Sequence, residues 1–384
     1  MKAFKLILIN ILIFLVALSP FEVIGQILIL IRPSYEVLFL QPDKVVGWKQ
    51  VPNFQWTWAG QYWYAADFSV PIKTNALGFR DRDRPLEKPH GVIRVALLGD
   101  SFIEAVQVPF EKTAGHLLEQ RLNAAFRNGP TPSRKYEVLN FGISHYGVGQ
   151  YLLTWEEYAS KYAPDYVAIF VAKLHMERTV NKYKHGEFRS TAGKRLWVRP
   201  IFRLENDVLI REPAKDFDEF VELQEALIST RYAGKRMRTR KRWVSAYYAK
   251  QLWDRLASVW ERMDRSGHPQ HPLEPEDDVV TLPSLLAINL KIIEELGRKV
   301  HAAGSRLVVV DVSQYFGDEE TIAKGLEEIC RSRGFGYIPL YEHLLHANRS
   351  GLSTRWTHDG HFNEAGNMIL ADVVQGWMAK HAAE

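Results

Sequence analysis

The sequence predicts an α/β protein in which a five-stranded parallel β-sheet lies between two layers of helices. Two observations lead to this prediction: apolar runs of strand length recur along the chain, and segments with helical periodicity alternate with them. Unbroken apolar strands that alternate with helices are typical of parallel sheets covered on both faces. Two further features interrupt this alternation, an apolar stretch at the N-terminus and a long charged stretch between the third and fourth strands.

The predicted strands and helices follow one another in a regular order. Strands are expected at Val92–Leu98, Tyr136–Leu139, Tyr166–Val171, Arg306–Val312 and Phe335–Leu340. Helices are expected at Thr113–Phe126, Gln150–Lys161, Leu285–Ala303, Glu319–Arg333 and Glu364–Lys380. In a sheet of this kind ligands bind beyond the carboxyl ends of the strands, so the loops that follow the strands should carry the functional residues.

Residues 173–280 interrupt the alternation because they are too long for a single crossover connection. We interpret them as a largely helical cap inserted into a domain that covers residues 90–384. Between Arg231 and Arg242 the cap holds seven Lys or Arg side chains and no acid. A run of this kind is either a solvated helix face or a site for anionic lipid headgroups or an acidic polysaccharide.

The N-terminal stretch is apolar enough to cross a membrane. From Leu6 to Ile31 the only formal charge is Glu22, and the length suffices for the roughly 30 Å hydrocarbon layer. Lys2 and Lys5 precede it, so the positive-inside rule predicts a single-pass anchor within residues 1–32 and an extracytoplasmic remainder. The alternatives are a cleaved signal peptide, although Pro20 follows the candidate cleavage site, and a buried cytosolic helix.

Residues 33–89 form a lead-in segment that is rich in aromatic side chains and proline. Seven of its aromatic residues gather in a short stretch: Trp48, Phe54, Trp56, Trp58, Tyr62, Trp63 and Tyr64. Alternation from Phe54 to Trp58 predicts a β-strand, with residues 67–72 as its hairpin partner. We interpret the hairpin as a cover for one end of the main domain; a platform on which sugar rings stack is the alternative.

The composition excludes several classes of protein. With 384 residues, 46% hydrophobic and 24% charged, the chain is neither disordered nor of low complexity. The single cysteine, Cys330, excludes an intrachain disulfide and a zinc site built on paired thiolates. A net charge of +4 is too weak to indicate a nucleic-acid partner. The histidines at 268, 271 and 301 lack metal-ligand spacing, and no phosphate-cradling glycine loop follows a strand, so neither a metal nor a cofactor is expected.

Three short motifs follow predicted strands or precede the last helix. Gly99-Asp100-Ser101-Phe102 follows the first strand, and Asn140-Phe141-Gly142 follows the second. Asp359-Gly360-His361-Phe362-Asn363 precedes the final helix. A serine at the end of a strand presents its hydroxyl and its N–H, a histidine can take the serine proton, and a carboxylate can orient the histidine. These residue types are those of a nucleophilic hydrolase or acyltransferase.

With these motifs, residues 74–172 and 281–384 resemble the SGNH (GDSL-type) hydrolase family, whose fold is flavodoxin-like. The resemblance implies that Ser101 is the nucleophile, His361 the base and Asp359 the acid, with the N–H groups of Ser101 and Gly142 as oxyanion donors. Residues 75–81, after a membrane segment, are similar to family members anchored in bacterial envelopes. The resemblance therefore implies an O-acyl esterase or O-acyltransferase at the inner membrane, with its catalytic domain outside the cytoplasm. Its substrate would be an acylated polysaccharide, and polysaccharide-biosynthesis proteins would be its partners.

The sequence departs from the family pattern at two positions. His175 stands where the family has an oxyanion asparagine; its ring either donates in the same way or is a cap residue without a catalytic role. Loss of one good oxyanion donor costs about 3 kcal/mol of transition-state stabilisation. The family's acid usually lies three residues before the histidine, where this chain has His358, so Asp359 takes the role from a spacing of two. The missing asparagine leaves open a second hypothesis, a catalytically inert glycan-binding or assembly protein on the same fold.

Overall fold

The computed structural model describes residues 10, 19–20, 22–23, 40–59, 67–127, 135–183, 188–189, 195–232 and 280–381. The chain divides into two units, residues 1–38 with 225–276, and residues 39–224 with 277–384. The first unit lies almost entirely outside the described residues, as does the predicted anchor at residues 6–31. Among the residues that are described, no helix combines the length and the apolar character that a membrane crossing requires.

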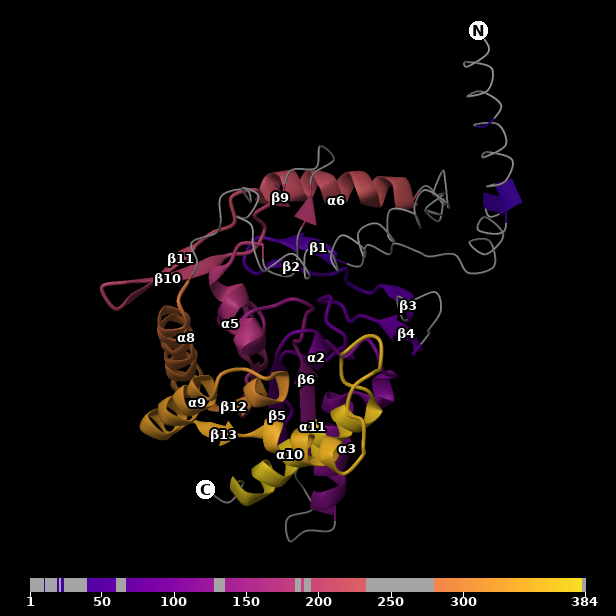
Figure 1. Ribbon diagram of the computed structural model, residues 1–384. Coiled ribbons are helices and arrows are strands. Elements are labelled where there is room, and N and C mark those ends of the chain that lie inside the picture. The colour runs from indigo at the N-terminus through magenta and orange to yellow at the C-terminus, as the bar shows by residue number, and fades with distance from the viewer. Residues whose placement is uncertain are drawn as a thin grey trace. The chain divides into compact units, whose positions relative to one another are not determined.

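Five parallel strands form the central sheet of the second unit, in the order β13–β12–β7–β5–β6 (Figure 1). Their bounds are β5 Val92–Leu98, β6 Lys135–Asn140, β7 Tyr166–Val171, β12 Arg306–Asp311 and β13 Gly336–Ile338. The chain runs from β5 outward to β6 and then crosses back to β7 on the other side of β5. The strand order therefore reverses at β5, and ligands of open α/β sheets bind at the carboxyl ends of the strands where such a reversal occurs.

Helices cover both faces of this sheet, which confirms the predicted three-layer arrangement (Figure 1). One face packs against α4 (Val148–Glu157), α8 (Leu282–Ala302) and α9 (Glu320–Arg333). The other face packs against α3 (Ala114–Arg127), α10 (Leu340–Arg349) and α11 (Glu364–His381). Each helix layer contributes its own buried apolar cluster, so the strands lie between two cores and read as continuous apolar runs.

Two predicted elements end differently in the structure. The fifth strand is shorter than predicted, because Pro339 caps the helix α10 that begins at Leu340. Proline lacks the N–H that a strand interior needs, and its fixed φ suits a helix start. The helix predicted at Gln150–Lys161 consists of α4 and a separate 3₁₀ helix at Ala159–Tyr162.

The lead-in segment contains two antiparallel hairpins, β1 (Leu40–Asp43) with β2 (Gly47–Gln50) and β3 (Gln55–Ala59) with β4 (Ser69–Lys73). The β3–β4 pairing confirms the predicted hairpin. Trp48 is 1% exposed and packs edge-on against Tyr146, so it belongs to the core and not to a sugar platform. Tyr62, Trp63 and Tyr64 lie outside the described residues.

The described part of the cap contains strands as well as helices, which corrects the expectation of a largely helical insertion for this part. Its elements are α5 (Lys173–Val180), β8 (Phe188–Arg189), β9 (Arg195–Leu196), β10 (Ile201–Glu205), β11 (Val208–Glu212) and α6 (Phe217–Tyr232). Asn206 and Asp207 join β10 to β11 with φ of 49° and 63°, the backbone of a two-residue hairpin turn. The basic run at residues 231–242 lies almost wholly outside the described residues.

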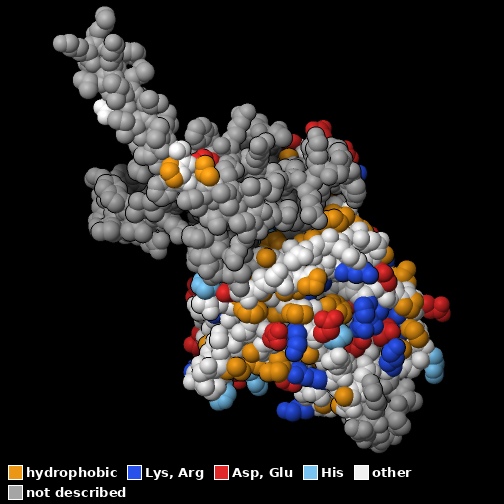
Figure 2. All heavy atoms as spheres, turned by 90° about the vertical axis from the view of Figure 1, so that its right-hand side faces the viewer, with side chains coloured by type: hydrophobic (Ala, Val, Ile, Leu, Met, Phe, Trp, Pro, Cys, Tyr) orange, Lys and Arg blue, Asp and Glu red, His pale blue; other side chains and the backbone are white. Residues whose placement is uncertain are grey.

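Charges of both signs are mixed on the described surface. Figure 2 shows Lys and Arg side chains beside Asp and Glu side chains on one face. Ion pairs such as Arg84–Glu119 at 2.6 Å and Arg121–Asp372 at 2.8 Å join opposite charges.

Candidate active site

Ser101 lies just after the carboxyl end of β5, as the first residue of the short helix α2 (Ser101–Glu104). Asp100 caps this helix, because its Oδ1 accepts a hydrogen bond from the Phe102 N–H at 3.0 Å. A Cβ on Gly99 would lie 2.2 Å from a side-chain carbon of α2, so the turn can close this tightly only with glycine. The Ser101 N–H belongs to the first turn of α2, whose N–H groups have no partner within the helix. The turn thus offers a hydroxyl and a backbone donor side by side.

His361 and Asp359 lie on the loop before α11, far from Ser101 along the chain but next to it in space. His361 Nε2 lies 2.8 Å from Ser101 Oγ, and His361 Nδ1 lies 2.5 Å from Asp359 Oδ1. Gly360 has a φ of +82°, which glycine adopts readily and which lets the Asp359 side chain fold back onto the ring. Because Nδ1–H donates to Asp359, Nε2 is left to accept the serine proton. The structure therefore brings together the three residues predicted as nucleophile, base and acid.

The loop that carries Asp359 and His361 is closed by its own backbone. The Trp356 N–H donates to the His361 carbonyl at 3.0 Å, and Arg355 forms a β-bridge with Phe362. The ring of Phe102 lies 5.0 Å from the ring of His361, and both Phe102 and Phe362 are buried. The base is thus held between its loop and an apolar cluster under the nucleophile turn.

His175 contacts Asp100, an arrangement that fits the second of its two alternatives, a residue without a role as an oxyanion donor. Its Nδ1 accepts the Ala172 N–H at 3.0 Å, so Nε2 carries the proton, and Nε2 lies 3.0 Å from Asp100 Oδ2. Arg178, one turn later in α5, donates to the same oxygen at 2.8 Å. Burial alone would raise the pKa of Asp100, but His175 and Arg178 hold this pKa well below its usual range. His175 and Arg178 therefore fix the charge and the position of the residue before the nucleophile.

Gly142 lies against the nucleophile turn, but its N–H already has an acceptor. A Cβ on Gly142 would lie 2.5 Å from the backbone nitrogen of Glu104, so only glycine permits this approach. The Gly142 N–H donates to Asn140 Oδ1 at 2.8 Å, and the Asn140 amide donates to the Ile103 carbonyl at 2.8 Å. The Gly142 N–H is therefore directed at Asn140 in this structure, and its role as an oxyanion donor stays a prediction.

Glu104 is a buried acid next to the site that the sequence analysis missed. Its carboxylate accepts from the Ser144 N–H at 3.0 Å and also contacts the Ser144 hydroxyl and the Gln50 amide. Burial raises the pKa of Glu104 to about 7. An acid three residues after the serine, within the apolar run from Phe102 to Val106, is the sequence signal that could have identified it.

His145 is a second residue that the sequence analysis missed. It has a φ of +68°, a left-handed conformation that is uncommon for residues other than glycine, and its side chain is exposed. The contacts on either side hold this backbone: Ser144 bonds to Glu104, and the Tyr146 carbonyl accepts from Arg178 at 3.2 Å. Backbone strain of this kind costs of order 1–3 kcal/mol and often occurs in functional loops.

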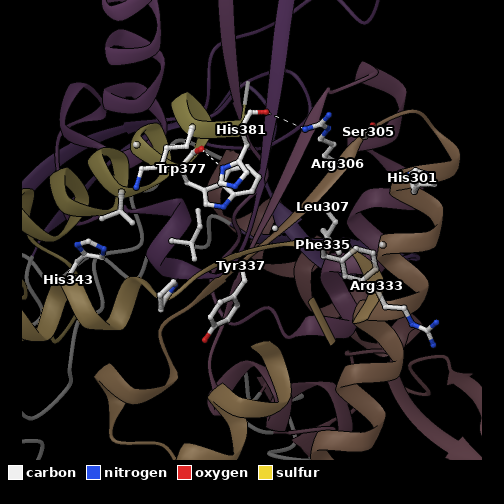
Figure 3. A pocket seen from close by; sticks show the side chains of 18 of the residues that line it. His301, Ser305, Arg306, Leu307, Arg333, Phe335, Tyr337, His343, Trp377 and His381 are labelled. Carbon is white, nitrogen blue, oxygen red and sulfur yellow. Dashed lines mark hydrogen bonds between the residues drawn. The ribbon is translucent and has the colours of Figure 1, made fainter. Parts of the chain in front are cut away.

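A groove of about 1080 Å³ lies at the opposite end of the sheet from Ser101, near the amino ends of β12 and β13 (Figure 3). Its cationic side chains include Arg306, and Arg333 and Lys380 in the last turns of α9 and α11. Cations in the last turn of a helix offset the negative end of its dipole, which accounts for their position here. The groove is separate from the three-residue hydrogen-bond chain. Within the described ranges, no cluster of three or more His, Cys, Asp or Glu side chains is suited to a metal ion.

Fold and site together define a three-layer α/β/α domain with a Ser–His–Asp hydrogen-bond chain at the carboxyl end of a parallel sheet. No protein-family model matches the chain, and no curated protein matches it either. Among solved structures, it is similar to TesA, with 11% identity and a TM-score of 0.40 over 75% of this chain and 98% of that chain. It is also similar to the acetyl xylan esterase AlAXEase, with 13% identity and a TM-score of 0.38 over 75% of this chain and 99% of that chain. A third similar structure is a catalytic mutant of Axe2, an acetylxylan esterase from Geobacillus stearothermophilus, with 11% identity and a TM-score of 0.38 over 74% of this chain and 94% of that chain.

Proposed function

We propose that this protein is a serine esterase or O-acyltransferase that acts on small O-acyl groups. One observation supports this proposal most strongly: the continuous hydrogen-bond chain from Ser101 Oγ through His361 to Asp359, with distances of 2.8 and 2.5 Å. A serine, a base within hydrogen-bond reach and a carboxylate that orients the base are the parts that nucleophilic acyl transfer requires.

The reaction proceeds through an acyl-enzyme. Ser101 Oγ attacks the carbonyl carbon of the ester while its proton passes to His361 Nε2, and Asp359 stabilises the imidazolium that forms. The tetrahedral intermediate collapses, the C–O bond to the alcohol breaks, and the alcohol leaves with the proton from Nε2. Water or a second alcohol then attacks the acyl-enzyme, with His361 again as base. Water gives hydrolysis and an alcohol gives transfer.

The packing around the nucleophile favours a small acyl group such as acetyl. Ser101 is only 5% exposed, and Phe102 and Phe362 are buried beside the catalytic histidine. A long acyl chain would need a tunnel past these rings, whereas an acetyl group needs room for one methyl group.

We further propose that the substrate is an O-acylated polysaccharide of the cell envelope, modified together with polysaccharide-biosynthesis proteins. The resemblance of residues 75–81 to envelope members of the SGNH family supports this proposal. The apolar stretch at 6–31, preceded by Lys2 and Lys5, supports an inner-membrane anchor with the catalytic domain outside the cytoplasm. Protease treatment of spheroplasts is expected to digest the catalytic domain; its survival would contradict this location.

A second candidate function is glycan binding without catalysis. Gly142 N–H and His175 are both committed to other partners, so the Ser101 N–H is the remaining predicted oxyanion donor. Removal of a single oxyanion donor costs about 3 kcal/mol in known hydrolases, so an incomplete oxyanion hole lowers the rate strongly. This observation favours an inert binding protein if no turnover is found.

Labelling with a fluorophosphonate probe, mapped to the modified residue, tests the proposed function. We expect the label on Ser101 of the wild type, no label in Ser101→Ala, and loss of 4-nitrophenyl acetate turnover in both Ser101→Ala and His361→Gln. Circular dichroism spectra like that of the wild type would show that both variants are folded. Absence of label and of turnover in the wild type would contradict the enzyme assignment, and retained glycan binding would then favour the second candidate.

A further inference from the structure

A carboxylate of the lead-in segment contacts the loop that carries the predicted acid and base. Asp67 lies two residues before β4, and its Oδ2 accepts the His358 N–H at 2.8 Å. Its Oδ1 lies 2.8 Å from Nδ1 of the His358 ring. Both oxygens of one carboxylate are therefore engaged by a residue 291 positions away along the chain.

Asp67 contacts the loop at the residue directly before the predicted catalytic acid, because His358 immediately precedes Asp359. The next lead-in residue extends the contact: Phe68 is 6% exposed, and its ring lies 5.7 Å from the ring of Trp356. The Trp356 N–H in turn donates to the His361 carbonyl at 3.0 Å. Two consecutive lead-in residues thus hold two points of the loop, one on each side of Thr357.

The backbone contacts within the loop leave one side of its turn open. Among the described residues, no atom lies within 4 Å of the place where a Cβ of Gly360 would lie, so this side of the turn between acid and base is open. The side chains of Asp359 and His361 are 12% and 28% exposed. The hydrogen bonds from His358 hold the pKa of Asp67 below its usual value, so this carboxylate is charged at neutral pH.

We propose that Asp67 is a positioning residue for the loop at 356–361, and that the β3–β4 hairpin is therefore part of the active site. This proposal rests on the proposed function in so far as its effect is read from activity. Asp67 does not touch the reacting atoms: it acts through His358 on Asp359 and His361. A misplacement of about 1 Å in a catalytic group can cost on the order of 100-fold in rate, so release of the loop is expected to lower turnover.

The test compares Asp67→Ala and Asp67→Asn with a matched control, Asp83→Asn. Asp83 belongs to the same lead-in segment and accepts the Ala76 N–H at 2.8 Å, but this contact stays within the segment. We expect Asp67→Ala to lower kcat and the rate of fluorophosphonate labelling by about 10- to 100-fold with KM unchanged. Asp67→Asn keeps an oxygen that accepts the His358 N–H and should recover most of the rate, while Asp83→Asn should match the wild type.

A second measurement does not depend on turnover. The proton shared by His361 Nδ1 and Asp359 at 2.5 Å is expected to give a downfield ¹H resonance, which His361→Gln assigns by its loss. In Asp67→Ala this resonance should broaden or disappear, and in Asp83→Asn it should persist. A sharp, unchanged resonance in Asp67→Ala would overturn the proposal whether or not the protein is an enzyme. In an active protein, unchanged labelling and unchanged kcat in Asp67→Ala would also overturn the proposal. A loss of rate in Asp83→Asn as large as that in Asp67→Ala would overturn it too.

Discussion

Glu104 links the protonation of a single buried side chain to the stability of the whole fold. The residue is fully buried, and its burial raises the pKa from 4.5 to about 7. In the unfolded chain the pKa returns to its ordinary value, so between about pH 4.5 and 7 the folded state holds a proton that the unfolded state has released. Stability therefore falls as the pH rises through this window, by about 3 kcal/mol in total.

The substitution Glu104→Gln should remove this dependence, because the amide stays neutral at every pH and keeps the shape of the side chain. Its oxygen can accept from Ser144, as the carboxylate does. Its NH₂ group would face Gln50, whose Oε1 is buried and, among the described residues, has no hydrogen-bond partner. If the Gln50 amide turns over, this oxygen accepts the new N–H.

Urea unfolding of the wild type and Glu104→Gln, followed by tryptophan fluorescence at pH 5, 6, 7 and 8, measures the effect. The variant should be more stable by about 3 kcal/mol at pH 8, and the difference should shrink toward zero near pH 4.5. Glu119→Gln is the control: burial opposes ionisation of Glu119, but the Val138 N–H and Arg84 hold its pKa below the ordinary value. The difference in unfolding free energy between Glu119→Gln and the wild type should stay constant from pH 5 to 8. A constant offset for Glu104→Gln as well would refute the reasoning.

Four further substitutions test contacts elsewhere in the fold, two near Ser101 and two in helices α8 and α11. Arg178→Met should cost about 3 kcal/mol of unfolding free energy, because the Asp100 carboxylate stays buried without the guanidinium that donates to it; a urea titration that gives under about 1 kcal/mol would contradict this. His145→Gly should leave stability unchanged or raise it by up to about 1 kcal/mol, since glycine adopts a φ of +68° without strain, and a clear drop in Tm would argue against strain there. Gly297→Ala places a Cβ 2.0 Å from the ring of Phe335 and should lower the free energy of unfolding by about 1–3 kcal/mol. Gly376→Ala places its Cβ in open space and should raise the free energy of unfolding by about 0.5–1 kcal/mol. Equal Tm shifts in the two variants would contradict this contrast.

The strands were predictable from the sequence because both faces of the sheet are buried. Val92–Leu98 and Tyr166–Val171 are strands with the predicted bounds, since a strand between two cores is mostly apolar along its whole length; Arg94 in the first strand is the exception. The meeting of Ser101 with His361 could be predicted only from the resemblance of their motifs to a known family, because the loop of His361 connects two helices, α10 and α11, and does not follow a strand.

The hydrogen-bond partners within the site were not predictable in the same way. Whether Gly142 offers a free N–H depends on the rotamer of Asn140, and whether His175 faces Ser101 depends on Asp100 and Arg178. Such choices are set by side chains that meet in three dimensions, so no spacing along the chain records them. The contact between Asp67 and His358 was hidden for the same reason.

The bond between Ser101 and His361 also has a consequence for the order in which the molecule assembles. It closes a loop of 260 residues, and contacts between such distant parts of a chain form late because a large loss of chain entropy precedes them. A partly folded species in which this loop has not yet docked therefore has a serine without its base. The chemistry that we propose begins only once the last loop has docked, so the reactivity of Ser101 is also a measure of completed folding.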